Sequence, residues 1–382
     1  MTAAKSSEFY ILFTLFHYYC AKNWEGERLY DPDDFELYHI VNIFALIIGL
    51  AYGMVAQKTQ FCFNGSIKDF VLSRSTRRAA SILTAMIAAI FSSQLFSYLY
   101  AIDFSTSIYL QSDINYIAII FGGLLFGAGM MRADGCSSRH LVKFSQGDLH
   151  SLVTLLCIAI FAYMTSKGLF SYGTALLQTD PVLLDLSSFI PNRPMSISIV
   201  IALLLLALWR AVPKVKNLLA CSDGFIVGTL IGLSWFVTGV VGFDGFDSSP
   251  LESLSFVYPS GKTLEYFMFF SGSTLSFSIT VIFGIVAGGF VMSFFNKKFR
   301  FNCAAPQNGD KLKNSILGGA MMGIGGILAM GCTIGQGLSG ISTLAVSSVI
   351  AIVSIFVSAY ITALYMAKKE ALPSCFSFDW DR

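Results

Sequence analysis

The segment FGGLLFGAGMMRADGC (residues 121–136) recurs in similar form as LGGAMMGIGGILAMGC (residues 317–332). At a constant offset of 196 residues, seven of the sixteen positions are identical, five of them glycines, and both copies end in Gly-Cys. We interpret the match as an internal duplication, which places Cys136 and Cys332 at equivalent points of two half-molecules. A chance resemblance is the alternative, because close helix packing in membranes favours small residues in any sequence.

The composition of the chain is that of an integral membrane protein. It is 55% hydrophobic and 13% charged, with a mean hydropathy of +0.67, which is too apolar for a soluble domain of 382 residues. A hydrocarbon core about 30 Å thick requires roughly 20 apolar residues per helix. Nine such stretches are present, at residues 39–56, 79–101, 114–131, 150–168, 196–211, 223–241, 274–295, 314–331 and 344–367. A net charge of +2 gives no indication of nucleic-acid binding.

Basic residues alternate between the loops that join these stretches. Nineteen of the 25 Lys and Arg residues fall in loops on one side or in the C-terminal tail, which the positive-inside rule assigns to the cytoplasm. The acidic N-terminus then lies outside an inner membrane. If the stretch at 196–211 is a linker, the first half begins with a span that enters from outside and the second half with a span that enters from the cytoplasm, so the two halves are inverted. The expected segments are an extracytoplasmic N-terminus (1–38), a first repeat (39–195), a linker helix (196–222), a second repeat (223–367) and a cytoplasmic tail (368–382).

Four segments between the stretches combine Gly, Ser or Thr with short apolar runs: residues 60–70, 134–150, 244–259 and 331–340. Irregular backbone at membrane depth is tolerated only where protein or a polar cavity satisfies its amides, so we expect re-entrant loops that line a path. Short helices in such loops would direct their N-termini, which attract anions, toward the centre. The loops hold few carboxylates, which favours an anion over a cation, although a neutral solute or ordinary surface loops would also fit.

Three of the eight cysteines, Cys62, Cys136 and Cys332, lie at span ends within Gly- and Ser-rich loops. Neither Cys62 nor Cys332 has a neighbouring histidine, and His140 stands alone beside Cys136, so a Cys-His nucleophilic site is poorly supported. The three thiols lack the clustered spacing of zinc sites, and no metal or cofactor is expected. Cys157, inside a span, is expected to serve packing. Soft thiols along a path suit a solute that contains soft sulfur, whereas the alternative is that they are small residues in tight turns.

The loop sequences resemble those of the YeeE/YedE family of sulfur transporters. The resemblance rests on QKTQFCFNGSIKDF (57–70), GCSSRHLVKFSQGDLHSL (135–152), PLESLSFVYPSGKTLEY (250–266), GSTLSFSITVIFG (272–284) and GCTIGQGLSGISTLA (331–345). It covers roughly residues 40–367 and implies an hourglass-shaped, all-α membrane protein with nine spanning helices in two inverted repeats. It also implies that Cys62, Cys136 and Cys332 guide thiosulfate through successive S–H contacts.

The sequence departs from the family pattern in two places. Arg139 and His140 stand where thiosulfate transporters of the family have smaller residues. These side chains could bind the anion or face phosphate or lipid, and anchoring of the loop at the membrane interface is the preferred interpretation. The second-half loop that matches Cys62 has Thr238-Gly239-Val240 in place of a thiol, so three path cysteines are expected and not four. The sequence is also similar to the YedE branch, which is associated with selenium metabolism, so a selenium compound is an alternative substrate.

The predicted function is uptake of thiosulfate or a related small sulfur anion, without enzymatic activity. Besides the three cysteines, the expected path includes small and polar residues of the same loops: Gly135, Ser137, Gly331, Thr333 and Gln336. The sequence contains no phosphate-binding loop for ATP, and a cytoplasmic sulfurtransferase is a candidate partner. The alternatives of another class are a membrane thiol protein that carries sulfane sulfur as a persulfide, and a membrane subunit with a structural role.

Overall fold

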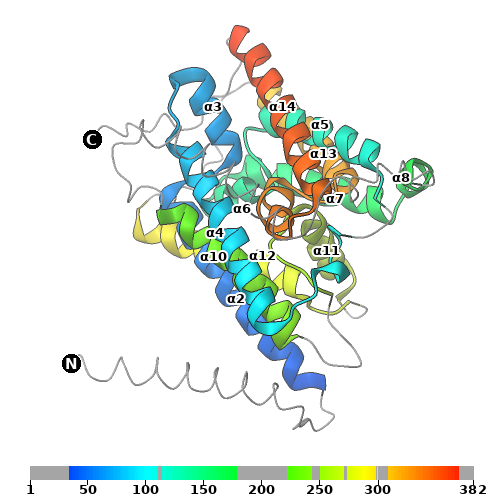
Figure 1. Cartoon of the computed structure of the whole chain (residues 1–382). Coiled ribbons are helices and arrows are strands. Elements are labelled where there is room, and N and C mark those ends of the chain that lie inside the picture. The colour runs from blue at the N-terminus through cyan, green and yellow to red at the C-terminus, as the bar shows by residue number, and fades with distance from the viewer. Residues whose placement is uncertain are drawn as a thin grey trace. The chain divides into compact units, whose positions relative to one another are not determined.

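The computed structural model describes residues 34–110, 114–178, 222–242, 250–270, 273–297, 299 and 309–369 (Figure 1). The chain divides into two compact units, Met1–His39 and Ile40–Arg382, and apart from the first turns of α2 the helices belong to the second unit. Nearly all of the expected linker helix lies outside the described residues, as do most of the N-terminal segment and most of the C-terminal tail.

Every regular element in the described part of the chain is helical, which confirms the expected all-α fold. The long helices are α2 (Asp34–Thr59), α4 (Arg77–Tyr100), α5 (Tyr116–Arg132), α7 (Leu149–Ser166), α10 (Ser222–Phe236), α12 (Phe277–Phe295), α13 (Gly309–Leu328) and α14 (Val346–Lys368). The shorter elements are α3 (Phe63–Ser73), η1 (Phe104–Thr106), α6 (Ser137–Ser145), α8 (Ser171–Gln178), the π-helix η5 (Val237–Val241), α11 (Val257–Met268) and the π-helix η7 (Gly335–Gly340).

Seven segments of the described chain are long and apolar enough to cross a membrane. They coincide with seven of the nine expected stretches, and they begin at residues 38, 77, 116, 149, 222, 277 and 346. The stretch at 196–211 lies outside the described residues. The stretch at 314–331 falls in α13, which is not among the seven because its first turn carries Asp310, Lys311 and Lys313 and glycines interrupt the rest. A total of nine spans therefore stays a prediction.

The spanning helices direct large apolar side chains outward and small or polar ones inward. Phe91, Ile117, Phe294 and Val353 are each more than half exposed, as expected of side chains that contact lipid. Soluble proteins rarely expose so many large apolar groups together. Inside the bundle, the buried hydroxyl of Ser234 donates to the Leu230 carbonyl, one turn earlier on the same helix, at 2.8 Å. The chain is therefore a multi-pass membrane protein.

The repeated glycines lie where helices approach each other most closely. A methyl group added to Gly122 of α5 would lie 2.5 Å from the Ala329 amide nitrogen, just beyond α13. One added to Gly325 of α13 would lie 2.6 Å from the Gly122 carbonyl oxygen, and Gly127 of α5 meets the Ile355 carbonyl of α14 in the same way. These glycines thus bring α5 against α13 and α14, and they have this packing role whether or not the halves share an origin.

Helix contacts occur in matched pairs when the two halves are aligned in chain order. The elements α2, α3, α4, α5, α6 and α7 then correspond to α10, α11, α12, α13, η7 and α14. The contact of α4 with α10 corresponds to that of α2 with α12, where Gly49 meets Gly284, and the contact of α5 with α14 corresponds to that of α13 with α7. Likewise, α3 contacts α14 as α11 contacts α7, and α6 contacts α12 as η7 contacts α4. Duplication predicts such a pattern, while the orientation of the halves in a membrane stays a prediction.

Candidate functional site

Cys62 lies at the N-cap of the short helix α3. Its backbone is extended, with φ −162° and ψ 124°, and its sulfur accepts a hydrogen bond from the Gly65 amide at 3.4 Å. The residue is 7% exposed. N-cap acceptors are normally oxygens, so a thiol here caps the helix weakly and holds its sulfur at the positive end of the helix dipole.

Cys332 repeats this geometry in the second half of the chain. Its sulfur accepts a hydrogen bond from the Gly335 amide at 3.3 Å, again three residues along. The helix that follows covers residues 333–342 and contains η7. The Cys332 side chain is fully buried. Gly331, directly before it, has a φ of 159° and lies against Gln336, so a side chain at this position would be both strained and crowded.

Cys136 lies at the N-cap of α6, but its thiol faces a side chain instead of a backbone amide. The sulfur is 3.2 Å from the Ser138 hydroxyl, and the residue is 1% exposed. A methyl group on the preceding Gly135 would lie 3.2 Å from Nε2 of His140, so the glycine lets the loop fold closely onto the first turn of α6. All three motif cysteines therefore lie immediately before a short helix.

Tyr52 of α2 lies near all three thiols. The thiols of Cys62 and Cys136 lie side by side, and Cys136 also faces Thr333, the residue after Cys332. Tyr52 is 1% exposed and lies within electrostatic range of all three thiols. The fold thus brings together three cysteines that are 74 and 196 residues apart along the chain.

Tyr52 itself was not expected from the sequence. Its ring packs on Phe256, with the ring centroids 5.5 Å apart. It shares the buried face of α2 with Ile48 and Ala56. The signal that could have found it is a hydroxyl on the helically spaced inner face of an apolar span, where a polar atom needs a partner.

Buried polar atoms without a protein partner gather in the three cysteine motifs. Over the described ranges they include Gln60 Nε2, Asn64 Oδ1, Ser137 Oγ, His140 Nε2, Thr333 Oγ1 and Gln336 Oε1. Folded proteins leave few buried polar groups unpaired, because each one costs about 1–3 kcal/mol. Such a cluster indicates a site that a polar solute or water completes.

The polar residues expected along the path differ in what they can offer. Ser137 and Thr333 have buried hydroxyls with no hydrogen-bond partner among the described residues, so both can donate to an oxyanion. Gln336 is also buried, but its Nε2 donates to the Ala329 carbonyl at 2.6 Å, which leaves only its carbonyl oxygen. In this orientation Gln336 braces the loop and presents an acceptor to its surroundings.

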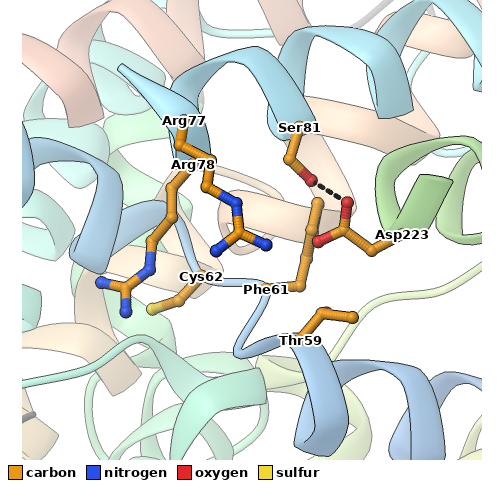
Figure 2. A pocket seen from close by; sticks show the side chains of 7 residues that line it. All are labelled: Thr59, Phe61, Cys62, Arg77, Arg78, Ser81 and Asp223. Carbon is orange, nitrogen blue, oxygen red and sulfur yellow. Dashed lines mark hydrogen bonds between the residues drawn. The ribbon is translucent and has the colours of Figure 1, made fainter. Parts of the chain in front are cut away.

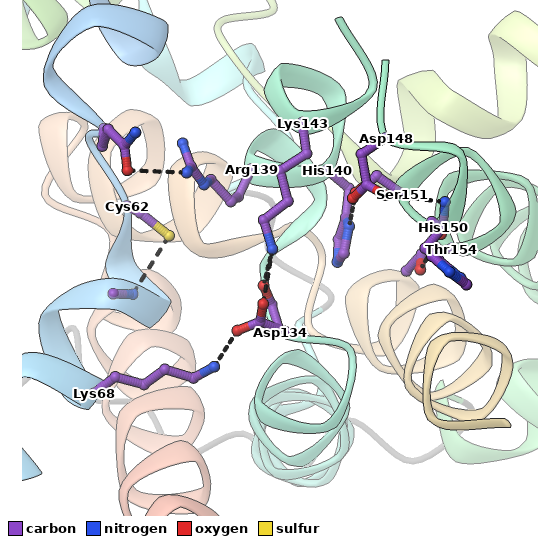
Figure 3. Close-up of polar contacts among 12 residues, drawn as sticks. Cys62, Lys68, Asp134, Arg139, His140, Lys143, Asp148, His150, Ser151 and Thr154 are labelled. Carbon is purple, nitrogen blue, oxygen red and sulfur yellow. Dashed lines mark hydrogen bonds and ion pairs between the residues drawn. The ribbon is translucent and has the colours of Figure 1, made fainter. Parts of the chain in front are cut away.

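Arg139 and His140 are buried, and the expectation that they anchor a loop at the membrane interface is wrong. Only 6% of Arg139 and 2% of His140 is exposed. Nη2 of Arg139 donates to Gln60 Oε1 at 3.2 Å, and the guanidinium lies within electrostatic range of the Cys62 thiol (Figure 3). Nδ1 of His140 is 3.1 Å from the Ser151 hydroxyl. Because α6 is buried along nearly its whole length, its polar residues face protein instead of lipid headgroups.

A buried ion-pair cluster connects α3 and α6 through the loop after α5 (Figure 3). The Asp134 carboxylate pairs with Lys68 and with Lys143, the latter at 2.9 Å, and Lys143 also donates to the Asp134 backbone carbonyl at 2.7 Å. The three side chains are between 7% and 11% exposed. Since Lys68 belongs to α3 and Lys143 to α6, Asp134 holds together the two helices that follow Cys62 and Cys136.

The structure and the sequence alignment assign different residues as the second-half counterpart of Cys62. Residues 238–240 lie in η5, where Thr238 donates to the Glu252 carbonyl at 2.8 Å. In element order α11 corresponds to α3, and the residue directly before α11 is Phe256. A fully buried phenyl ring therefore takes the position that a thiol has in the first half.

The site gathers groups of a kind that can bind a small anion. Among the described residues, no group of three or more His, Cys, Asp or Glu side chains is arranged to hold a metal ion. The imidazole of the second motif contacts Ser151 instead of a cysteine. The site combines soft sulfur, hydroxyl donors and the buried guanidinium of Arg139, and together these groups complement an anion that has both oxygen and sulfur atoms.

A family model described as sulphur transport matches residues 58–361 of the chain. The Escherichia coli (strain K12) protein named Thiosulfate transporter TsuA is 25% identical over 313 residues, which cover 77% of this chain and 85% of that protein. The Spirochaeta thermophila protein of the same name is 26% identical over 321 residues, 79% of this chain and 92% of that protein. The E. coli protein named Probable transporter YedE is 26% identical over a shorter alignment of 108 residues, which covers 28% of this chain and 25% of that protein. The chain therefore belongs to the sulphur transport family, as its resemblance to YeeE/YedE proteins predicted.

Proposed function

We propose that the protein carries thiosulfate, or a closely related small sulfur anion, across an inner membrane into the cytoplasm. The observation that carries this proposal is the convergence of three buried thiols and unpartnered hydroxyls in the motifs of a sulphur transport family. Relatives that align with more than three quarters of the chain are named thiosulfate transporters. Uptake of a sulfur anion is therefore the function that best fits the site.

The oxygen end of the ion needs hydrogen-bond donors. A dianion in a narrow protein path loses most of its water, which is costly unless fixed donors replace it. The N-termini of α3 and α6 present aligned backbone amides that attract negative charge. Ser137 and Thr333 add hydroxyl donors, and Arg139 adds a buried positive charge beside Cys62. These groups suit the three sulfonate oxygens of thiosulfate.

The thiols suit the other end of the ion. The terminal sulfur of thiosulfate is soft and polarizable, and neutral S–H groups of Cys332, Cys136 and Cys62 can contact it weakly in turn. Several modest contacts permit passage, whereas one strong site would trap the ion. A thiolate would repel the dianion, so transport requires that the thiols stay neutral.

The order of these contacts follows from the proposed topology. The basic loops assign the Cys62 and Cys136 segments to the cytoplasmic side, and inverted halves assign the Cys332 segment to the opposite side. The matched helix contacts of the two halves support this arrangement. The ion then meets Cys332 first and leaves past Cys136 and Cys62, where a cytoplasmic sulfurtransferase would consume it.

The adjacency of Cys62 and Cys136 favours one second candidate, a thiol protein that carries sulfane sulfur. A thiolate that attacked the terminal sulfur of thiosulfate would form a persulfide and release sulfite. This reaction needs a base to activate the thiol, and His140 contacts Ser151 instead. Intact-protein mass spectrometry after incubation with thiosulfate separates the two: a persulfide adduct supports the carrier of sulfane sulfur, and unmodified protein supports transport.

Uptake by purified protein in liposomes tests the proposal. We expect accumulation of radiolabelled thiosulfate, with sulfate competing at least about tenfold more weakly, a difference of about 1.4 kcal/mol. The two ions share charge and shape and differ in one soft atom, so this comparison isolates the sulfur contact. Equal competition by sulfate, or uptake no greater than in protein-free liposomes, contradicts the proposal. Stronger competition by selenosulfate than by unlabelled thiosulfate would instead assign a selenium substrate.

A further inference from the structure

A small pocket lies beside Cys62, where the end of α2, the loop before α3 and the first turns of α4 and α10 meet (Figure 2). It is lined by Thr59, Phe61, Cys62, Arg77, Arg78, Ser81 and Asp223. In the sequence, Arg77 and Arg78 count only as charges of a basic loop. In the structure, both are half-buried and line the same pocket as a motif thiol.

Arg78 is held in place by Gly65 and Asp69. Its Nη1 donates to Asp69 Oδ1 at 3.2 Å, and 12% of its side chain is exposed. A methyl group on Gly65 would lie 2.6 Å from this Nη1, so the glycine leaves room for the guanidinium against the first turn of α3. Because the Gly65 amide also donates to the Cys62 sulfur, one residue positions both the thiol and the guanidinium.

The Arg78 guanidinium keeps donor capacity beside the thiol. An arginine has five N–H donors in a rigid planar fork, and two neighbouring donors can bind two oxygens of one oxyanion. Asp69 uses Nη1, whereas Nε of Arg78 has no hydrogen-bond partner in the described chain. The guanidinium lies within electrostatic range of Cys62. The edge that contains Nε can therefore take an anion oxygen close to the sulfur.

Two carboxylates near the guanidinium groups limit the strength of this attraction. Asp69 pairs with Arg78, and Asp223 accepts a hydrogen bond from the Ser81 hydroxyl at 2.6 Å. Figure 2 shows the Arg77 side chain extending toward the Ser81–Asp223 pair. With these negative charges nearby, the two arginines attract a dianion without holding it tightly, which is what a site of release requires.

The geometry points to a binding site for a small sulfur oxyanion in this pocket, with the sulfonate oxygens on Arg77 and Arg78 and the terminal sulfur at Cys62. The inference rests on the proposed transport function, and the basic loop places the site at the cytoplasmic end of the path. The ion passes from the neighbouring thiols of Cys62 and Cys136 onto the two guanidinium groups and leaves from there. Arg77 and Arg78 both line this pocket beside the Cys62 thiol, so they favour an anion over a cation there.

Charged thiol reagents test the site without requiring transport. Two methanethiosulfonates, one carrying an ethylsulfonate group and one an ethyltrimethylammonium group, are applied to the purified full-length protein. Labelling of Cys62 is followed by peptide mass spectrometry, and the ratio of the anionic to the cationic rate is divided by the same ratio for free cysteine. We expect this normalised ratio to be about 10, and we expect thiosulfate to protect Cys62 from labelling.

Substitutions of the two arginines should remove this preference. Arg77→Gln and Arg78→Gln should each bring the normalised ratio close to 1, and either variant suffices if the other does not fold. Arg74→Gln is the matched control and should keep the wild-type ratio, because Arg74 lies in the same loop but is exposed and does not line the pocket. A ratio that neither arginine variant changes, or a Cys62 that the sulfonate reagent does not reach, overturns the inference.

Uptake measured on the same preparations separates this inference from the proposed function. If the wild-type protein takes up thiosulfate but neither Arg77→Gln nor Arg78→Gln changes the labelling ratio, the inferred anion site is wrong and the proposed transport function stands. If the ratio depends on both arginines in a protein that takes up no sulfur anion, the site stands and the proposed function is wrong.

Discussion

A thiol is a weak cap for a helix, yet Cys62 and Cys332 both occupy the capping position. Each accepts one long hydrogen bond from a glycine amide three residues ahead. Serine is a far better N-cap, but it would replace soft sulfur by hard oxygen. The proposed function explains the cysteine at this position, whereas the stability of the short helix does not.

We expect Cys332→Ser to keep or raise the thermal unfolding midpoint of the protein in detergent, because a hydroxyl accepts the Gly335 amide better than a sulfur does. Thiosulfate uptake should nevertheless fall by about tenfold or more, equivalent to losing about 1.4 kcal/mol of contact with the terminal sulfur. Cys157→Ser is the control, since Cys157 lies on α7 outside the three motifs. Wild-type uptake by Cys332→Ser would show that the sulfur atom is not needed.

Removal of an unpartnered hydroxyl should separate transport from stability. Ser137→Ala should lower uptake at subsaturating thiosulfate by about tenfold or more, because a hydrogen bond to a charged group contributes about 1.5–3 kcal/mol. Its unfolding midpoint should not fall, since the Ser137 hydroxyl has no partner among the described residues. Ser354→Ala is the matched control, because this buried hydroxyl donates to the Ala351 carbonyl at 2.8 Å. If Ser137→Ala transports normally, its hydroxyl does not contact the ion.

At the scale of elements, α3 and α6 decide where two of the thiols meet. With 11 and 9 residues, neither helix is long enough to be stable alone in water. Burial against the spanning helices and the ion pairs of Asp134 fix their positions. Removing that carboxylate would leave Lys68 and Lys143 as two buried like charges, so the cluster is expected to be a stability requirement as well as a positioning device.

Asp134→Asn should destabilise the protein by about 3–5 kcal/mol, the usual cost of removing one partner from a buried ion pair. The measurement is the thermal unfolding midpoint in detergent, with thiosulfate uptake recorded beside it. Lys167→Gln breaks an exposed pair with Glu265, in which the lysine side chain is 53% exposed, and should cost no more than about 1 kcal/mol. Equal midpoints for the two variants would mean that the Asp134 cluster does not hold α3 and α6 in place.

At the scale of the whole molecule, the two halves meet along α5, α13, α7 and α14. Glycines let these helices approach closely, as at Gly122 and Gly325. This interface lies next to the Gly-Cys end of each copy of the repeated segment, because Cys136 follows α5 and Cys332 follows α13. Packing of the halves therefore determines how near the thiols of one half lie to those of the other.

Gly122→Ala should lower the unfolding midpoint and the yield of folded protein, because the added methyl would meet the Ala329 backbone nitrogen at 2.5 Å. Overpacking of this kind costs about 1–3 kcal/mol. Gly173→Ala is the matched control, because no heavy atom lies within 4 Å of a methyl group at that position. The control should be neutral or stabilised by about 0.5–1 kcal/mol through helix propensity. A Gly122→Ala protein as stable as the control would contradict the close contact of α5 with α13.

The sequence alone was sufficient to predict the features that do not depend on how the helices pack together. Seven spans were located because a bilayer requires long apolar runs whatever their neighbours are. Cys62, Cys136 and Cys332 stood out because each ends an apolar run in a loop rich in small residues. Short helices were expected in the re-entrant loops, and each of the three cysteines directly precedes one.

Features that depend on which helices pack together could not be read in advance. Arg139 and Lys143 look like part of an ordinary basic loop, because periodicity does not reveal that α6 is buried on nearly all sides. Asp134 gave no sign that it pairs with a lysine 66 residues away. Tyr52 lies in an apolar span, and only the arrangement of α2 beside the motif loops shows that it lies among the thiols.

Participation of the thiols in transport is tested most directly by thiosulfate uptake in liposomes that contain equal amounts of wild-type protein, Cys136→Ala or Cys157→Ala. Cys136 lies beside Cys62 and faces Thr333 at the centre of the site, whereas Cys157 is only partly buried and lies on α7. We expect Cys136→Ala to abolish uptake while Cys157→Ala retains the wild-type rate. Uptake by Cys136→Ala at the wild-type rate would contradict a path lined by thiols.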